Sequence, residues 1–396
     1  MSTRRAIRPR SRAARLVALV VAVLSCTPPA PAAAETTYRV RGLLDLGLVS
    51  SVHGRDINQL TMGDSNFDPY RLRLFLDARV APGLELHAQT IFHEGMAALR
   101  ADGAYALYTP WPERDLALEA GKIPLFVGTY APRTYSDRNS LVGTPLMYQY
   151  RTSLVWGDLV PDADALVAQA GTGQLDLTKV FLPVVDERWW DTGAAVLGSI
   201  RPVEFAFGIV QGSPSWPSPG ADNTPGLSVA GRLGLVPCTG VRLGVSATEG
   251  TWLPAWLAFA LPPGASVRDY HERTLLGDVE LARGPFELRG EAVHRTWETI
   301  ATGDLEVDGG YGEARWALSC GAWLALRGEA LRFSDITTSA GVRPWDDGVD
   351  RWEAVTGYRV TQDVRAKAGF QRTVHQPFGT GRTRDDLWFA QLGIRF

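Results

Sequence analysis

Apolar and polar residues alternate with a period of two along most of this chain. In residues 70–80, YRLRLFLDARV, one set of alternate positions holds tyrosine, leucine, alanine and valine. The other set is Arg71, Arg73, Phe75, Asp77 and Arg79. A helix would place residues two positions apart on nearly opposite sides, whereas a strand places them on one face. The same alternation recurs in 37–49 and 286–297, and it predicts strands.

Sixteen segments show this pattern, and the connections between them alternate between short and long. Short turns such as 81–83 and 201–202 alternate with loops such as 50–68 and 249–269. This layout is typical of outer-membrane barrels, and a soluble sandwich or propeller would not explain it together with the signal peptide described below. We therefore predict an all-β fold, a transmembrane antiparallel β-barrel of 16 strands. The predicted strands span 37–49, 69–80, 84–93, 98–109, 114–123, 190–200, 203–211, 226–236, 240–248, 270–283, 285–297, 308–318, 322–333, 350–361, 363–373 and 385–396.

The longest connection, 124–189, follows the fifth predicted strand. Within it, PDADALVAQAG (161–171) predicts a short helix, with Asp162 as N-cap and Gly171 just after its end. If 150–158 and 163–171 were both strands, the barrel would have 18, which is also an even number. We expect 124–189 to fold inward and to narrow the pore. The charged residues expected at this constriction are Lys122, Arg133, Asp137, Arg138 and Arg151.

The segment 386–396, DLWFAQLGIRF, keeps the alternation up to its final phenylalanine. In a closed barrel the last strand pairs with the first, because an open edge in lipid leaves backbone groups without hydrogen-bond partners. We therefore expect this strand to be structural throughout. Its predicted lipid-facing residues are Trp388, Ala390, Leu392, Ile394 and Phe396.

The first 34 residues have a different pattern. Six arginines precede an apolar run at 16–24, LVALVVAVL, and a small-residue stretch that ends at 32–34. This order predicts a secretory signal peptide over 1–34 and one outer-membrane barrel domain over 35–396. A membrane anchor would need a longer run, of about 18 residues. The sequence VLSC at 23–26 leaves N-terminal lipidation as an alternative.

The net charge of residues 35–396 argues against nucleic acid as a partner. Six of the 40 Lys and Arg residues lie in the first 34 positions, so 34 remain against 43 Asp and Glu, a net charge of −9. A chain without a basic excess is not expected to bind nucleic acid. Three cysteines, one of them in the signal region, are too few for a disulfide scaffold.

Charges are unevenly distributed over the predicted inner face. Where the last three strands meet the first two, ten bases stand against three acids, whereas the strands between 270 and 333 carry more acids than bases. A generic charged surface would mix the signs more evenly. We expect the basic side to line a water-filled lumen and to favour anions. The predicted pore-lining bases are Arg39, Arg41, Arg71, Arg73, Arg79, Arg359, Arg365 and Lys367, to which Arg351 and Arg395 add two more. The three acids on this side are Asp45, Asp77 and Glu353.

No metal site, cofactor or catalytic residue is predicted. His87 and His93 lie six positions apart on one strand without a third ligand. No H-E-x-x-H, G-x-S-x-G or P-loop sequence occurs. Residues of a barrel enzyme can be distant in sequence, so an enzyme or a surface adhesin without an open channel is the alternative.

Several tryptophans fall near predicted strand ends. Outer-membrane barrels place aromatic residues there, at the two lipid–water boundaries. The tryptophans expected in these girdles are Trp111, Trp190, Trp297, Trp352 and Trp388.

Two short stretches resemble Gram-negative porins, and most nearly the phosphate-selective O/P type. GKIPLFVG at 121–128 is similar to that family's Gly-Lys/Arg-x-x-x-Pro-Phe-Gly-like stretch, and LGIRF at 392–396 resembles the terminal signal that the barrel-assembly machinery reads. The resemblance implies a sixteen-stranded homotrimer in the outer membrane, with a loop folded into the pore. Such proteins pass small hydrophilic solutes by passive diffusion. Pro124 stands earlier than in the family pattern, so a phosphate preference is not carried over.

Overall fold

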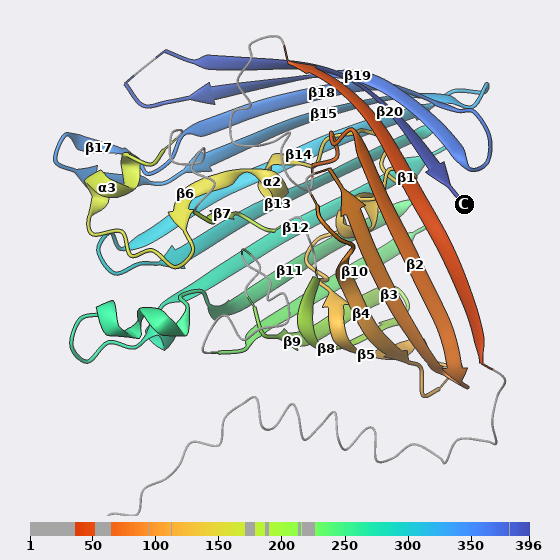
Figure 1. The fold of residues 1–396 in the computed structure, drawn as a ribbon, viewed down its shortest axis with the longest axis horizontal. Coiled ribbons are helices and arrows are strands. Elements are labelled where there is room, and N and C mark those ends of the chain that lie inside the picture. Colours follow the sequence, from red (N-terminus) through yellow and green to blue (C-terminus); the bar gives the residue numbers. More distant parts are fainter. Residues whose placement is uncertain are drawn as a thin grey trace, which may run out of the picture.

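The protein is a closed antiparallel barrel of 16 strands, as predicted (Figure 1). The computed structural model describes residues 36–51, 65–94, 96–111, 113–170, 179–186, 190–212, 215, 226–379 and 381–396. The predicted signal peptide, 1–34, lies outside the described residues. Each barrel strand pairs with the next along the chain, and the last pairs with the first. The barrel strands are β1 (Thr37–Ser51), β2 (Tyr70–Ala81), β3 (Leu84–His93), β4 (Arg100–Tyr108), β5 (Leu116–Pro124), β8 (Trp190–Ile200), β9 (Val203–Val210), β10 (Ser228–Cys238), β11 (Val241–Thr251), β12 (His271–Arg283), β13 (Phe286–Glu298), β14 (Asp304–Ala317), β15 (Ala322–Phe333), β18 (Gly348–Arg359), β19 (Val364–Gln376) and β20 (Thr383–Arg395).

The period of two separates an apolar outer face from a mixed inner face. On β2, Arg71 and Arg73 are buried inside, whereas Leu76, one of the alternate residues, is 44% exposed on the outside. On β15, Leu326 is 60% exposed, and Arg327 beside it is buried. An apolar outer band is the surface that a barrel presents to lipid. Among the described residues, no helix is long and apolar enough to cross a membrane.

The barrel closes between β1 and β20. The amide of Gly42 donates to the carbonyl of Phe396 (2.7 Å), and the amide of Phe396 donates back to Gly42 (3.0 Å). The ring of Phe396 lies on Gly42, where a Cβ would come within 2.2 Å of it. Phe396 and Trp388 are 67% and 57% exposed on the outer face. Leu392 and Ile394 lie half-buried on the same face, since they occupy alternate positions of the strand.

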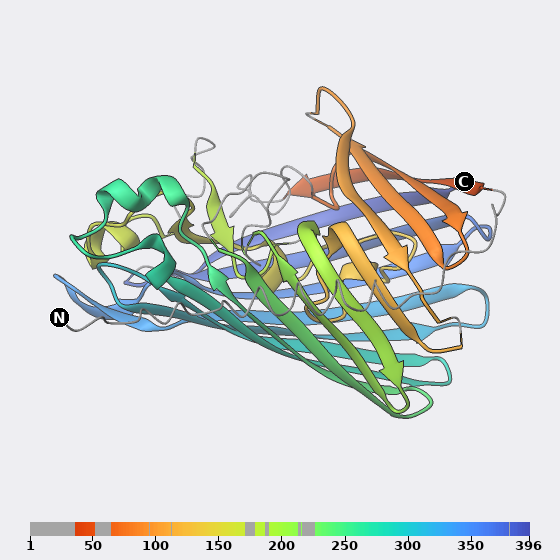
Figure 2. The same cartoon turned by 90° about the horizontal axis from the view of Figure 1, so that it is seen from below.

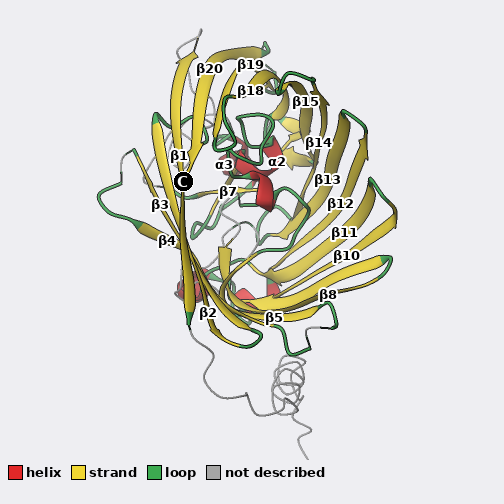
Figure 3. Cartoon of the chain, turned by 90° about the vertical axis from the view of Figure 1, so that its right-hand side faces the viewer, coloured by secondary structure: helices red, strands yellow, loops and turns green. Residues whose placement is uncertain are grey.

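The connection between β5 and β8 contains short elements of its own. These are η2 (Ala131–Arg133), α2 (Leu146–Gln149), β6 (Arg151–Val155), α3 (Ala163–Val167) and β7 (Phe181–Pro183). Viewed along the barrel, α2, α3 and β7 lie within the ring of strands (Figure 3). Because β6 and β7 pair only with each other in a separate sheet, the eighteen-strand alternative is wrong.

The helix predicted after Asp162 is present. The Asp162 side chain accepts a hydrogen bond from the Ala165 amide (2.8 Å), which is the interaction expected of an N-cap. The helix α3 ends at Val167, earlier than the sequence indicates. Gly171 lies outside the described residues.

Long loops gather at one end of the barrel and short turns at the other (Figure 2). The long-loop end carries η4 (Ala255–Ala260), η5 (Val267–Asp269) and a separate hairpin of β16 (Asp335–Thr338) and β17 (Gly341–Pro344). Inside this end lies an apolar core that includes Trp297, which is fully buried and meets the Trp345 ring edge-on at 6.0 Å. The prediction that Trp297 belongs to an outer girdle is therefore wrong. The barrel interior is not polar throughout, because loop residues supply apolar partners here.

Candidate pore and its two walls

The β5–β8 connection lies against one side of the barrel interior, which we call the covered wall, the inner faces of β11–β15, β18 and β19. Carboxylates on this wall accept hydrogen bonds from the connection. Glu291 on β13 binds the Thr129 amide (2.5 Å). Glu313 on β14 binds the Ser140 hydroxyl (2.9 Å). Burying an unpaired backbone amide costs free energy, and here the wall carboxylates accept hydrogen bonds from buried groups of the connection.

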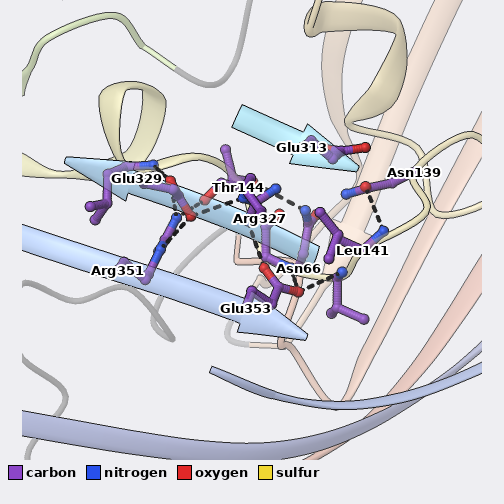
Figure 4. A network of polar contacts seen from close by, with 12 residues as sticks. Asn66, Asn139, Leu141, Thr144, Glu313, Arg327, Glu329, Arg351 and Glu353 are labelled. Atoms are coloured by element: carbon purple, nitrogen blue, oxygen red, sulfur yellow. Dashed lines mark hydrogen bonds and ion pairs between the residues drawn. The ribbon is translucent and has the colours of Figure 1, made fainter. Parts of the chain in front are cut away.

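Four charged residues of β15 and β18 hold residues 142–146 of the connection (Figure 4). We call them the clasp; they are Arg327, Glu329, Arg351 and Glu353. Glu353 accepts from the amides of Val142 (2.9 Å) and Gly143 (3.0 Å), and Glu329 accepts from the Leu146 amide (2.5 Å).

The clasp also neutralises itself. Arg327 binds Glu353 (2.6 Å) and Glu329 (2.9 Å), and Arg351 binds Glu329 (2.8 Å). Arg327 donates to the Gly143 carbonyl (2.8 Å) and Arg351 to that of Thr144. All four side chains have no exposed surface, so their charges are used within the protein and do not face a solute.

A second anchor surrounds Glu291. The phenol of Tyr148, on α2, donates to this carboxylate. Arg133 donates to the Thr129 hydroxyl (3.0 Å) and to the Tyr311 phenol oxygen (3.2 Å). Burial raises the pKa of the Tyr148 phenol well above its usual value, which favours the protonated form that donates to Glu291. Arg133 therefore binds the covered wall, although the sequence predicts it at the constriction.

The opposite side of the interior, the inner faces of β1–β4, is the open wall. Strand register arranges its residues in rows. Arg39 lies opposite Asp77, Asp77 opposite His87, and His87 opposite Tyr105. The next row is Arg41, Phe75, Gln89 and Gly103. Asp77 joins the rows, because it accepts from Arg41 (2.6 Å) and lies 2.8 Å from Nδ1 of His87.

A cavity of about 630 Å³ lies over the open wall near the short-turn end. The connection contributes Tyr135, Asp137 and Arg138 to it. The charged barrel residues that line it are Arg39, Arg41, Asp77, Arg79, Glu85 and Arg395.

A smaller cavity, of about 40 Å³, lies next to the first, and Gln89 and Trp190 line both. Its charged lining consists of Arg71, Arg73, Arg100 and Asp102. A further carboxylate, that of Asp45, lies 3.1 Å from Arg71 and 4.0 Å from Arg73, and it also accepts from the Ser136 hydroxyl. The Asp45 carboxylate is thus shared by Arg71, Arg73 and the hydroxyl of Ser136.

The structure separates the predicted residues into several environments. Arg39, Arg41 and Arg79 line the large cavity, together with Asp137 and Arg138, and Arg71 and Arg73 line the small one. Lys367 is buried and donates to the carbonyls of Ser136 (2.8 Å) and Leu141 (3.0 Å), and Arg365 donates to the carbonyl of Asp137. Lys122 donates to the Ala101 carbonyl (2.9 Å), Arg151 lies 3.5 Å from Asp186, and Arg359 is exposed at the end of β18.

Sequence reasoning missed several residues of the smaller cavity. The register of β3 and β4 shifts between Gln89 and Thr90, which places Arg100 opposite the buried Ile91. Trp190, predicted in an outer girdle, instead lies over Gly103, where a Cβ would come within 2.3 Å of its ring. A glycine inside a strand is the one sequence sign of such an approach.

Among the described residues, no three His, Cys, Asp or Glu side chains lie close enough together to hold a metal ion. No protein-family model and no curated protein sequence matches this chain.

Several solved structures share the fold. An anion-selective porin from Comamonas acidovorans has a TM-score of 0.60 at 10% identity, over 91% of this chain and 100% of that chain. OmpF of Salmonella typhi, solved with daunomycin, has a TM-score of 0.55 at 10% identity, over 91% of this chain and 97% of that chain. The outer-membrane channel DcaP of Acinetobacter baumannii has a TM-score of 0.54 at 8% identity, again over 91% and 97%. This likeness shows a barrel fold shared with outer-membrane porins, and the resemblance to the phosphate-selective type stays a prediction.

Proposed function

We propose that this chain is an outer-membrane porin through which small hydrophilic solutes diffuse passively, with a modest preference for anions. In this proposal residues 1–34 direct export, and the β5–β8 connection narrows the lumen. The apolar outer band of the barrel and its likeness to solved porins support the placement in outer-membrane lipid. No reaction is involved, because passage depends on pore width and on the charges that line the pore.

The observation that carries the anion preference is the difference between the two walls. The two cavities of the open wall are lined by eight arginines and four carboxylates. The arginines are Arg39, Arg41, Arg71, Arg73, Arg79, Arg100, Arg138 and Arg395, and the carboxylates are Asp77, Glu85, Asp102 and Asp137. A solute in these cavities passes within a Debye length, about 8 Å, of the excess positive charge. Local charge therefore outweighs the net charge of −9.

We further propose that the outer face of β20 presents the signal for the barrel-assembly machinery. The residues are Trp388, Leu392, Ile394 and Phe396, which lie on one face of the closing strand. Changing Phe396 to Asp would place a charge on that face and is expected to block assembly. A homotrimer, implied by the resemblance to porins, is part of this proposal.

The test is electrical. Purified protein is inserted into a planar bilayer, and the zero-current potential is measured across a KCl gradient. We expect stable channels whose potential shows an excess of chloride current, with the excess shrinking as salt rises. Absence of stable channels would contradict the porin proposal, and a potassium excess at low salt would contradict the anion preference alone.

A further inference from the structure

One buried cation of the open wall lacks full pairing. Arg73 is 7% exposed, and its Nε and Nη1 have no hydrogen-bond partner among the described residues. Its nearest carboxylate oxygen belongs to Asp45, 4.0 Å from Nη1, and Asp45 is already bound to Arg71. These two nitrogens have almost no accessible surface, so their charge is only partly compensated inside the protein. An anion in the small cavity would pair with the part of the Arg73 guanidinium that lines it.

One aromatic ring lies against this arginine, and a second ring lies beyond the first. The guanidinium of Arg73 lies 5.3 Å from the centre of the Tyr135 ring, and the Tyr135 ring meets Phe75 edge-on at 5.5 Å. The guanidinium of Arg41 lies 5.7 Å from the centre of the Phe75 ring. Guanidinium groups and aromatic rings therefore alternate along this part of the open wall and the adjoining connection.

A second aromatic group faces the same cavity. His87 and Tyr105 stack at 5.1 Å, and Tyr105 lies 6.2 Å from Trp190. All three residues line the large cavity. Rings that present their faces and edges in this way favour another ring over an aliphatic group of equal size.

The two cavities differ in what they can hold. The small one, about 40 Å³, accommodates a group near the size of one or two water molecules, such as a carboxylate. The large one, about 630 Å³, lies in the range of small-molecule sites. Gln89 and Trp190 line both, so the two cavities are neighbours, and a ligand that spans them must pass these side chains and the hydrogen bond from the Tyr135 hydroxyl to Gln89 (2.6 Å).

We propose that the two cavities form one binding site for a small aromatic carboxylate, whose carboxylate pairs with Arg73 and whose ring packs against Phe75, Tyr105 and Trp190. This inference rests on the proposed function and names a solute class for the pore. Inorganic phosphate would use the same arginines but would gain nothing from the rings. The aromatic residues are therefore what separates the two kinds of anion.

The experiment compares two blockers of equal charge in single-channel recordings. Benzoate carries an aromatic ring, and cyclohexanecarboxylate carries a saturated ring of similar size. Each is added to a chloride solution, and the concentration that halves the chloride current is measured. For the unaltered protein we expect benzoate to block at about a threefold lower concentration than cyclohexanecarboxylate.

Three variants sharpen the comparison. Arg73→Gln is expected to raise the half-blocking concentration of both acids about tenfold, because a charge-assisted pair is lost. Phe75→Leu is expected to raise it for benzoate alone. Arg242→Gln is the matched control and is expected to change neither, because Arg242 pairs with Glu204 (3.0 Å) on the other side of the barrel.

The outcomes distinguish this inference from the function on which it rests. Anion-selective channels that neither acid blocks, or that both acids block equally with Phe75→Leu unchanged, would overturn the aromatic site and leave the porin proposal standing. Block that survives Arg73→Gln in full would overturn the assigned carboxylate position. If no stable channel forms, both proposals fail.

Discussion

Both walls of the barrel interior carry arginines and carboxylates, but on the covered wall these side chains bind the β5–β8 connection and on the open wall they line cavities. On the covered wall, Arg327 and Arg351 are paired with Glu329 and Glu353, and the same side chains bind the backbone of the β5–β8 connection. On the open wall, Arg71 and Arg73 share one carboxylate, Asp45, and cavities lie beside them. A charged residue on the inner face therefore need not line a cavity, because the charges that bind the β5–β8 connection are fully buried.

The largest effect is expected when most of the β5–β8 connection is deleted, because this exposes the covered wall. Pro124 and Trp190 are already paired across β5 and β8, so four Gly and Ser residues can replace 126–188. We expect conductance to rise at least about twofold, with a shift toward cations, because Glu291 and Glu313 would then face water. Glu329 and Glu353 stay paired with Arg327 and Arg351 and add no net charge. Single-channel recording measures both quantities.

Heat-modifiable mobility in gels is the control that the shortened barrel is folded. A folded barrel with unchanged conductance would mean that the connection does not narrow the route of ions. Increased conductance with unchanged selectivity would mean that the covered carboxylates remain paired without the connection.

A smaller effect is expected from reducing the positive charge of the open wall. Arg39→Gln with Arg79→Gln removes two positive charges that line the large cavity. We expect the chloride-to-potassium permeability ratio to fall about twofold at low salt, since both charges lie near the solute. The matched control is Arg283→Gln with Arg384→Gln, two exposed arginines that line neither cavity. Equal shifts in the two double variants would mean that overall charge, and not the wall, sets selectivity.

The clasp itself is tested by Glu353→Gln. The amide keeps the shape but loses the charge that binds Arg327 at 2.6 Å, and a buried pair broken on one side costs about 3–5 kcal/mol. We expect a lower unfolding temperature and more current flicker, because residues 142–143 are held less firmly. Glu287→Gln is the control; its pair with Arg315 is partly exposed, and we expect a loss of under about 1 kcal/mol. Equal effects of both variants would contradict a special role for the clasp.

The smallest expected effect depends on pH and lies at the long-loop end of the covered wall. Burial raises the pKa of Asp346 to about 7, although the amides of Asp347 and Ser153 bind the carboxylate. A carboxyl with a raised pKa binds its proton more tightly in the folded state, so its protonation adds stability as pH falls from 7 to 4. That contribution is lost as pH rises through 7.

The measurement is the unfolding temperature at pH 5 and at pH 8. Asp346→Asn is expected to flatten the difference, and Asp335→Asn, at an exposed position, is the control. The opposite slope would mean that the two amides hold Asp346 charged, so that its pKa lies below the usual value.

Strand count and face assignment were predictable because a period of two survives along each strand. The inner positions of Arg71 and Arg73 and the N-cap of Asp162 follow directly from local pattern. The covered wall was not predictable, since the partners of Glu353 lie 210 and 211 positions away in the connection. Trp297 and Trp190 were misplaced for the same reason: distant loop and strand residues decide which side of the barrel they occupy.

The closure between Gly42 and Phe396 has a consequence for the order of folding. The two hydrogen bonds that join these residues form only when the first and the last strand lie side by side. Until then β1 has a free edge on one side, and such edges pair with other chains. Contacts between residues this far apart also form slowly, because a long stretch of chain must be ordered first. The edge of β1 is thus open to wrong pairing until β20 takes its place beside it.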